Sequence, residues 1–429
     1  MAVNTDLRLQ NQVIYSVYVR AHTPEGTFNA VVPDLDRIRA LGTDIIWFMP
    51  IHPIGAKGKK GSLGCPYANR DYRAVNPEYG TLDDFRKLCD EIRQRGMKVM
   101  IDVVYNHTSP DSVLWETHPE FFYKRADGTP GNHVGEWTDV IDLDYQVPEL
   151  WDYQIESLTQ WARIVDGYRC DVASFVPVEF WKRARKAVEA VHPGFIWLAE
   201  TVHRDFGAYC RSRGMYSARD PEVFEAFDLE YEYDIRLVFD QYLRRETVLS
   251  QWTDLLEFQE AVYPENYNKM RFLENHDQPR IASFVKDEKD LVNFTAMLYF
   301  LKGSTLIYAG QEWEDTHLPS LFEKEPINRL TGRDLTPLMQ ELSRIKHDVL
   351  DPDDAFFAHA VDSEDIAVMV RLNHKAKKIG VFSLRSRSAD VRVDAPDGQY
   401  ENLVDGSLMT VTGGMIHTEG NPIIFSIPL

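Results

Sequence analysis

The sequence has few cysteines, no long hydrophobic run and a shortage of positive charge. Only four cysteines occur in 429 residues, none in a Cys-x-x-Cys pair, which excludes a disulfide framework and indicates a reduced, intracellular protein. No window approaches 18 uninterrupted apolar residues, so no transmembrane helix is predicted. The 47 basic and 67 acidic side chains give a net charge of −20, which repels phosphate backbones and argues against a nucleic-acid partner.

The first ten residues also lack the basic and apolar regions of a secretory signal. We therefore expect a cytoplasmic protein with no membrane partner and a neutral substrate. Hydrophobic residues make up 44% of the chain and charged residues 27%, values that are typical of a globular protein with a large core.

Short apolar runs alternate with amphipathic stretches from Val13 to about Lys346. Several runs are apolar on both faces, as is typical of parallel strands covered by helices. Seven are clear strand candidates: Val13–Val19, Asp44–Met49, Lys98–Val104, Val165–Cys170, Phe195–Ala199, Met270–Phe272 and Thr305–Tyr308. An eighth is predicted near Phe224–Asp228, and eight strands favour a (β/α)8 TIM barrel over a doubly wound sheet.

Two of the intervening helices have clear start signals. Thr81-x-x-Asp84 predicts a capping box, followed by apolar residues on one face and by Gly96 as a terminator. Pro148 opens a second stretch with apolar residues at helical spacing.

Two segments depart from the strand–helix alternation. Residues 107–147 are polar and irregular, and their length predicts a small loop domain inserted after the third strand. After about residue 351, short alternating runs separated by Asp-Gly and Gly-Gly turns predict a C-terminal antiparallel β-sandwich of residues 351–429. The barrel is then predicted to comprise residues 1–106 and 148–350.

Carboxylates lie at or just after the ends of four predicted strands: Asp102, Asp171, Glu200 and Asp277. Arg169 and Asp171 are two residues apart on one strand, so they share a face, and we expect the arginine to lower the pKa of the acid. Each acid alone is equally explained by a structural ion pair or a cap. Acids at the carboxyl ends of four barrel strands together indicate a catalytic face.

Several motifs follow one another in a specific order: Gly42–Pro50, Tyr67-x3-Asp71-Tyr72, Asp102-Val-Val-Tyr-Asn106-His107, Asp142-Leu-Asp144, Gly167-Tyr-Arg-Cys-Asp171, Glu200, Asn275-His276-Asp277 and Gly310-Gln311-Glu312. In this order they resemble the α-amylase family of glycoside hydrolases (glycoside hydrolase family 13), along nearly the whole chain. The resemblance implies a retaining α-glycoside hydrolase that acts on α-glucans or maltooligosaccharides by double displacement.

The resemblance also implies catalytic roles. Asp171 would be the nucleophile, Glu200 the general acid/base, and Asp277 the carboxylate that stabilises the transition state. Because this mechanism needs one ionised and one protonated carboxyl, we expect Glu200 to be less acidic than Asp171.

Substrate-binding roles follow from the same resemblance. Tyr67 would stack on the sugar ring, and Arg169 would support the nucleophile. His107 and His276 would hold hydroxyls of that sugar, with Asp102 beside them.

The chemistry requires no cofactor, but Asn106 and Asp142 lie where relatives bind a structural Ca²⁺. The sequence departs from relatives that act on long starch chains, because Val172-Ala-Ser-Phe175 replaces the Lys-His that follows the nucleophile there. We therefore expect short maltooligosaccharides to be the better substrates. Four aromatic residues could be further sugar subsites or packing residues: Trp115, Trp137, Phe175 and Trp313.

The sequence leaves three alternatives open. A transglycosylase or an α-glucosidase would use the same Asp171 and Glu200. An inactive sugar-binding homologue would be expected to have lost one of the catalytic acids, and all three are present. The oligomeric state is not determined by the sequence.

Overall fold

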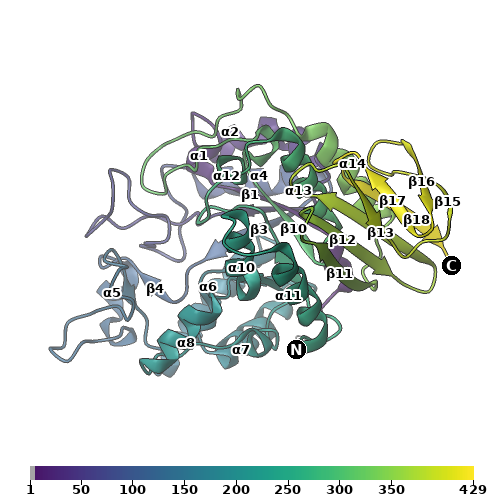
Figure 1. Ribbon diagram of the computed structural model, residues 1–429. Coiled ribbons are helices and arrows are strands. Elements are labelled where there is room, and N and C mark those ends of the chain that lie inside the picture. Colours follow the sequence, from purple (N-terminus) through teal and green to yellow (C-terminus); the bar gives the residue numbers. More distant parts are fainter. Residues whose placement is uncertain (1–4) are drawn as a thin grey trace.

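The computed structural model describes residues 5–429 and contains a closed barrel, an excursion from it and two C-terminal sheets (Figure 1). Eight parallel strands close the barrel in this order: β1 (Val13–Val17), β2 (Ile45–Phe48), β3 (Lys98–Val103), β6 (Gly167–Cys170), β7 (Ile196–Ala199), β8 (Leu229–Tyr231), β9 (Lys269–Arg271) and β10 (Ser304–Tyr308). This arrangement confirms the predicted (β/α)8 fold.

The position predicted for the eighth strand, near Phe224–Asp228, is wrong. That segment follows the short helix α9 (Asp220–Val223), and the strand is β8, which begins at Leu229. Phe227 packs its ring against Trp181 and Trp197, so the apolar run marks a turn buried against other aromatic rings. The sequence pattern does not indicate a strand at this position because the central residue, Glu230, is a buried carboxylate.

Helices surround the barrel, and the longer ones are α3 (Leu35–Ala40), α4 (Leu82–Gln94), α6 (Pro148–Trp161), α7 (Val178–Glu189), α8 (Arg204–Ser212), α10 (Tyr233–Leu243), α11 (Leu249–Val262), α13 (Glu288–Phe300) and α14 (Thr336–Asp348). Shorter helices are α1 (Val19–His22), α2 (Phe28–Val31) and α12 (Ile281–Phe284). The capping box is confirmed, because Thr81 and Asp84 exchange hydrogen bonds at the start of α4. No helix within residues 5–429 has the length and apolar character of a membrane span.

Apolar side chains fill the barrel interior, so the barrel is a packed core and not a channel. Ile14, Trp47, Met100, Leu198 and Leu306 belong to one fully buried cluster inside the strands. A larger cluster lies between the strands and the helices. Because the interior is filled, ligands can only be bound beyond the strand ends.

The excursion after β3 has secondary structure of its own. His107–Thr108 (β4) pairs antiparallel with Ile141–Asp142 (β5), and α5 (Val113–Thr117) lies between them in the chain. Phe121 and Leu143 are buried beneath this segment. The excursion therefore holds residues of β4 and β5 beside the carboxyl end of β3, at the left in Figure 1.

Two four-stranded antiparallel sheets follow the barrel, and their strands are β11 (Ala355–Val361), β12 (Ile366–Leu372), β13 (Ala376–Ser383) and β18 (Ile423–Pro428) in one, and β14 (Ala389–Arg392), β17 (Met415–Thr418), β16 (Leu408–Thr412) and β15 (Gly398–Glu401) in the other. Val368 of the first sheet and Val411 of the second share one buried apolar cluster, as in a sandwich. The predicted C-terminal antiparallel module is confirmed.

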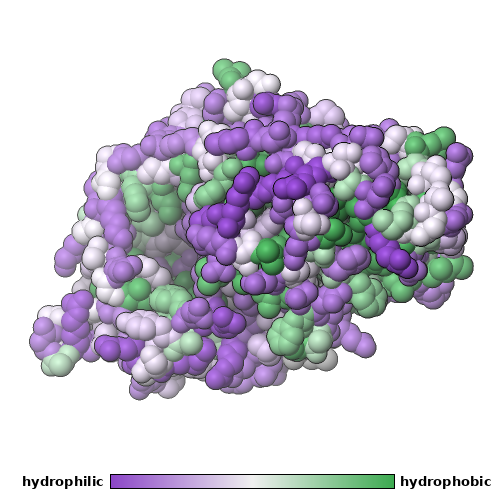
Figure 2. Space-filling view, viewed as in Figure 1, coloured by the Kyte–Doolittle hydropathy of each residue, from purple (hydrophilic) through white to green (hydrophobic). Residues whose placement is uncertain are grey.

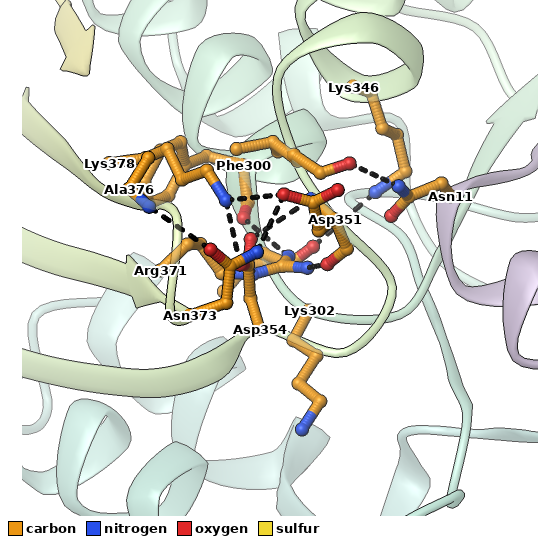
Figure 3. Close-up of polar contacts among 12 residues, drawn as sticks. Asn11, Phe300, Lys302, Lys346, Asp351, Asp354, Arg371, Asn373, Ala376 and Lys378 are labelled. Atoms are coloured by element: carbon orange, nitrogen blue, oxygen red, sulfur yellow. Dashed lines mark hydrogen bonds and ion pairs between the residues drawn. The ribbon is translucent and has the colours of Figure 1, made fainter. Parts of the chain in front are cut away.

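A buried polar network joins these sheets to the barrel (Figure 3). Lys378 on β13 donates to Asp351 at 2.8 Å and to Asp354 at 2.7 Å, and Asp354 is fully buried. Arg371 on β12 donates to the carbonyl oxygen of Asp351 at 2.9 Å. Lys346, at the end of α14, donates to the carbonyl of Gly303 at 2.9 Å. The charge-assisted bonds of Lys378 and Arg371 fix the segment that leads from the barrel into the sandwich.

Candidate active site

All eight residues predicted from the sequence lie together at the carboxyl ends of the barrel strands. Asp171 and Glu200 directly follow β6 and β7, and Asp277 lies in the loop after β9. Tyr67 comes from the loop after β2, and His107 from β4. Five of the eight line a cavity of about 360 Å³, and Figure 2 shows the surface hollowed at the left of the view, between the upper loops and the excursion.

One buried arginine joins three of the carboxylates. Nη1 of Arg169 donates to Oδ1 of Asp102 and to Oδ1 of Asp171, both at 2.9 Å. Nη2 lies 2.6 Å from Oε1 of Glu200. Asp102 and Arg169 are neighbours in register across β3 and β6, and both are fully buried. The strand pairing itself therefore positions the guanidinium between the predicted nucleophile and the predicted acid.

A second set of contacts links Tyr67 to Asp277. The Tyr67 hydroxyl donates to Oδ2 of Asp102 at 2.9 Å and lies 2.7 Å from Nε2 of His276. The Tyr67 and His276 rings are stacked, with centroids 5.3 Å apart and planes 10° apart. The same Nε2 lies 3.1 Å from Oδ2 of Asp277. One face of the tyrosine ring is thus covered by His276, and this stack orders the side chain.

The eight residues differ in their access to the cavity. Five line it: Tyr67, His107, Asp171, Glu200 and Asp277. Asp102, Arg169 and His276 are buried beneath this lining. Nε2 of His107 lies 3.9 Å from Oδ2 of Asp171, on the side of the carboxylate that faces away from the arginine.

The two central carboxyls differ in acidity. Burial raises the pKa of Asp171 to about 6 and that of Glu200 to about 7, and Arg169 only partly offsets this in both. The expectation that Arg169 holds the pKa of Asp171 below its usual value is therefore wrong, because desolvation outweighs the ion pair. The expected order, with Glu200 the weaker acid, agrees with these values.

Asp277 has the opposite shift. Burial raises its pKa, but the neighbouring His276 lowers it more, so the net pKa of Asp277 is below its usual value. Burial likewise lowers the pKa of His276, while the Asp277 carboxylate raises it more. Each member of the pair thus favours the charged form of the other.

The residue after Asp171 has a conformation that the sequence does not reveal. Val172 has φ 35° and ψ 45°, in the left-handed region that β-branched residues rarely adopt. This turn directs its N–H to Oε2 of Glu200 at 2.9 Å. No sequence signal identifies such a position, because glycine or asparagine would be expected there.

Only Trp137 among the four candidate aromatic residues lines the cavity. Trp115 packs edge-on against Phe122 within the excursion. The guanidinium groups of Arg37 and Arg329 lie 4.3 and 4.9 Å from the centroid of the Trp313 ring. The Phe175 ring lies 6.4 Å from the Trp137 ring and outside the cavity lining. Packing explains three of the four.

At the predicted calcium position one carboxylate oxygen of Asp142 is hydrogen-bonded, and the other, Oδ1, is buried without a partner among the described residues. Oδ2 of Asp142 accepts from Nδ1 and from the N–H of His133, both at 2.7 Å. The amide nitrogen of Asn106 lies 3.1 Å from Nδ1 of His107. Across residues 5–429, no three His, Cys, Asp or Glu side chains form a cluster suited to a metal. Ca²⁺ requires six to eight oxygen ligands, and Asn106 and Asp142 fall far short of that number.

A (β/α)8 barrel with paired carboxylates at its carboxyl face is the arrangement of the barrel glycoside hydrolases. The family model described as "Alpha amylase, catalytic domain" matches residues 8–125 and 135–355. The model described as "Bacterial Alpha amylase C-terminal domain" matches residues 357–425. The chain therefore belongs to the α-amylase family of glycoside hydrolases.

Solved structures resemble the chain over its whole length. An α-amylase from Lactobacillus plantarum is 43% identical and superposes with a TM-score of 0.95, covering 98% of this chain and 100% of that one. A maltogenic α-amylase, AmyB, from Thermotoga neapolitana is 29% identical with a TM-score of 0.88, covering 98% and 100%. Among curated proteins, α-amylase MalA of Haloarcula japonica is 25% identical over 94% of this chain, which spans only 61% of that relative.

Proposed function

We propose that this protein is a retaining α-glycoside hydrolase of α-amylase type that acts on α-glucans or maltooligosaccharides. The observation that carries the proposal is the guanidinium of Arg169, which contacts Asp171 at 2.9 Å and Glu200 at 2.6 Å. Two carboxyls held by one guanidinium are close together, whereas an inverting pair leaves room for a water molecule between acid and base. Family membership supports the same reaction.

In the first step, Asp171 attacks the anomeric carbon while Glu200 protonates the departing glycosidic oxygen. The attacking oxygen is Oδ2, because Oδ1 is held by Arg169. A glycosyl–Asp171 ester forms, and the shortened sugar chain leaves with the proton from Glu200. The pKa of about 7 keeps Glu200 protonated near neutral pH for this purpose.

In the second step, Glu200 takes a proton from water, and the oxygen attacks the same carbon. The ester bond to Asp171 breaks, and the sugar is released with its original anomeric configuration. Asp277 is ionised and exposed to the cavity, so it is placed to bind sugar hydroxyls and to stabilise positive charge on the ring. Asp102, Arg169 and His276 position these groups from below.

Substrate length follows from the wall beside the nucleophile. Ser174 and Phe175 stand in place of the Lys-His of relatives that act on long starch chains, and neither residue lines the cavity. Trp137 supplies the one indole of the lining. With few remote contacts, kcat/KM should rise over the first few glucose units and then level off. A kinetic series from maltose to maltoheptaose, with soluble starch, tests this, and starch as the best substrate would contradict it.

Product analysis tests the alternative of transglycosylation. A sugar hydroxyl can replace water as acceptor in the second step without any change in Asp171 or Glu200. Products longer than the substrate, detected by chromatography at high maltotriose concentration, would show that transfer competes with hydrolysis.

A further inference from the structure

The two walls of the cavity are built differently. Thr201, Val202 and His203 directly follow Glu200 and line one wall. Because Glu200 is the proposed proton donor to the leaving group, this wall flanks the departing sugars. The opposite wall lies beyond Tyr67 and flanks the sugar that is transferred to Asp171. It comes from the loops after β2 and β10, including Lys60, Leu321 and Phe322.

Those two loops are bonded directly to each other. The N–H of Leu63 donates to the carbonyl of Phe322 at 3.0 Å. The N–H of Ser62 donates to Oε1 of Glu323 at 2.7 Å, and the Ser62 hydroxyl donates to the other oxygen of the same carboxylate. At Gly61, with φ +63°, an added Cβ would lie 2.5 Å from Cβ of Phe322. The loops therefore touch through backbone with no space between them.

A buried arginine holds both loops from below. Nη1 of Arg20 donates to the carbonyl oxygens of Gly64 and Leu321, each at 3.0 Å. Its guanidinium also pairs with Glu78 at 2.8 Å, and the Arg20 side chain is fully buried. The hydroxyl of Tyr18 donates to the same Leu321 carbonyl at 3.0 Å. Such satisfied, charge-assisted bonds make this wall a fixed part of the structure.

The wall continues into the excursion through an ion pair. Nζ of Lys60 lies 3.1 Å from Oδ1 of Asp139, which is only 6% exposed. Both residues line the cavity. Residues 57–64, residues 318–325 and Asp139 thus form one continuous barrier, which we call the clasp.

We propose that the clasp closes the cavity on the side of the transferred sugar, so that the enzyme cleaves near the non-reducing ends of α-glucan chains and releases short products. The inference rests on the proposed function and specifies the part of the substrate that fits. An internal segment of a long chain would have to pass through the contacts between Ser62 and Glu323 or between Lys60 and Asp139. A chain end needs only to enter from the leaving-group side.

The test uses a maltoheptaoside whose non-reducing end is blocked by an ethylidene group, compared with the same unblocked substrate. Wild-type enzyme should cleave the blocked substrate at least about fiftyfold more slowly, because the bulky end group clashes with a closed wall. The double variant Lys60→Ala/Glu323→Ala should raise the blocked-to-unblocked rate ratio at least about tenfold by opening that wall. The control Lys375→Ala/Glu265→Ala removes one cation and one anion from exposed positions outside the clasp and should leave the ratio unchanged.

The outcomes separate this inference from the proposed function. Equal wild-type rates on both substrates would overturn the clasp and leave the hydrolase assignment intact, whereas no cleavage of either would overturn the hydrolase. Wild-type discrimination that the opened variant keeps would also overturn the clasp. Thermal unfolding of each variant confirms folding, and the conservative pair Lys60→Met/Glu323→Gln replaces the double alanine variant if the latter does not fold.

Discussion

The N–H of Val172 donates to Oε2 of Glu200 at 2.9 Å, so the residue after the proposed nucleophile holds the proposed acid. The bond requires Val172 to adopt φ 35°, a conformation that costs free energy for a β-branched residue. Two separate contacts therefore fix Glu200 relative to Asp171: the guanidinium of Arg169 and the N–H of Val172. The strained conformation of Val172 thus lies between the two carboxyls, whose spacing decides between retention and inversion.

The pH dependence of kcat/KM should follow the two carboxyls. Activity should rise as Asp171 ionises through a pKa of about 6 and fall as Glu200 loses its proton through a pKa of about 7. Glu200→Gln should remove the falling limb and reduce the rate on natural substrates about 10²–10⁴-fold. An activated aryl glycoside should lose much less rate, since its leaving group needs little acid assistance. Equal losses on both substrates would argue against the acid role.

Asp171→Asn should abolish turnover while the protein stays folded. The amide cannot form the glycosyl ester, so kcat should fall at least about a thousandfold. The comparison is Asp254→Asn, an exposed position on α11 that should keep full activity. A variant at position 171 that kept even a tenth of the wild-type rate would refute the nucleophile assignment.

Ionisation of Glu200 should lower the free energy of unfolding as the pH rises. Its folded pKa of about 7 lies above the value in an unfolded chain, so the unfolded state binds fewer protons between about pH 4 and 7. The folded state is therefore penalised increasingly across that window, and the full penalty is present above pH 7. Glu200→Gln should raise Tm over wild type at pH 8, by a margin that shrinks at pH 5. A margin that grew on acidification would contradict the cause given for the shift.

Calcium should contribute little to the stability of this chain. His133 holds the carboxylate of Asp142 with two bonds of 2.7 Å, so a chelator such as EDTA should leave Tm unchanged within about 1 °C. His133→Ala should lower Tm by about 2–4 °C through the lost hydrogen bond. His374→Ala, at an exposed histidine, serves as the matched control. A large fall in Tm with EDTA, restored by calcium, would show that the ion binds.

The sequence predicts the parts of this structure that depend on local pattern. The apolar strands, the capping box of Thr81 and Asp84, and a strand over residues 366–372 all appear as predicted. The strand β8 was misplaced because Glu230 breaks the hydrophobic run, and its charge is compensated by Lys269, 39 residues away. A pattern read along the chain cannot reveal such a distant partner.

For the candidate site as well, the sequence predicts some features, and others depend on the folded structure. The order of the motifs predicts that the eight residues lie together. How deeply each is buried depends on closure of the barrel, which buries Asp102 and Arg169 beneath Tyr67. The sequence predicts the sign of the Arg169 effect on Asp171 but not the larger effect of burial on that pKa. The clasp was missed because Lys60 and Asp139 are far apart in the chain and belong to loops without periodicity.

The stereochemistry of the first product tests the central claim most directly. Two displacements through Asp171 retain the anomeric configuration, whereas direct attack by water inverts it. Proton NMR of the earliest reaction mixture distinguishes the two anomers before they interconvert. The proposed mechanism predicts that the α-anomer appears first, and initial formation of the β-anomer would contradict it.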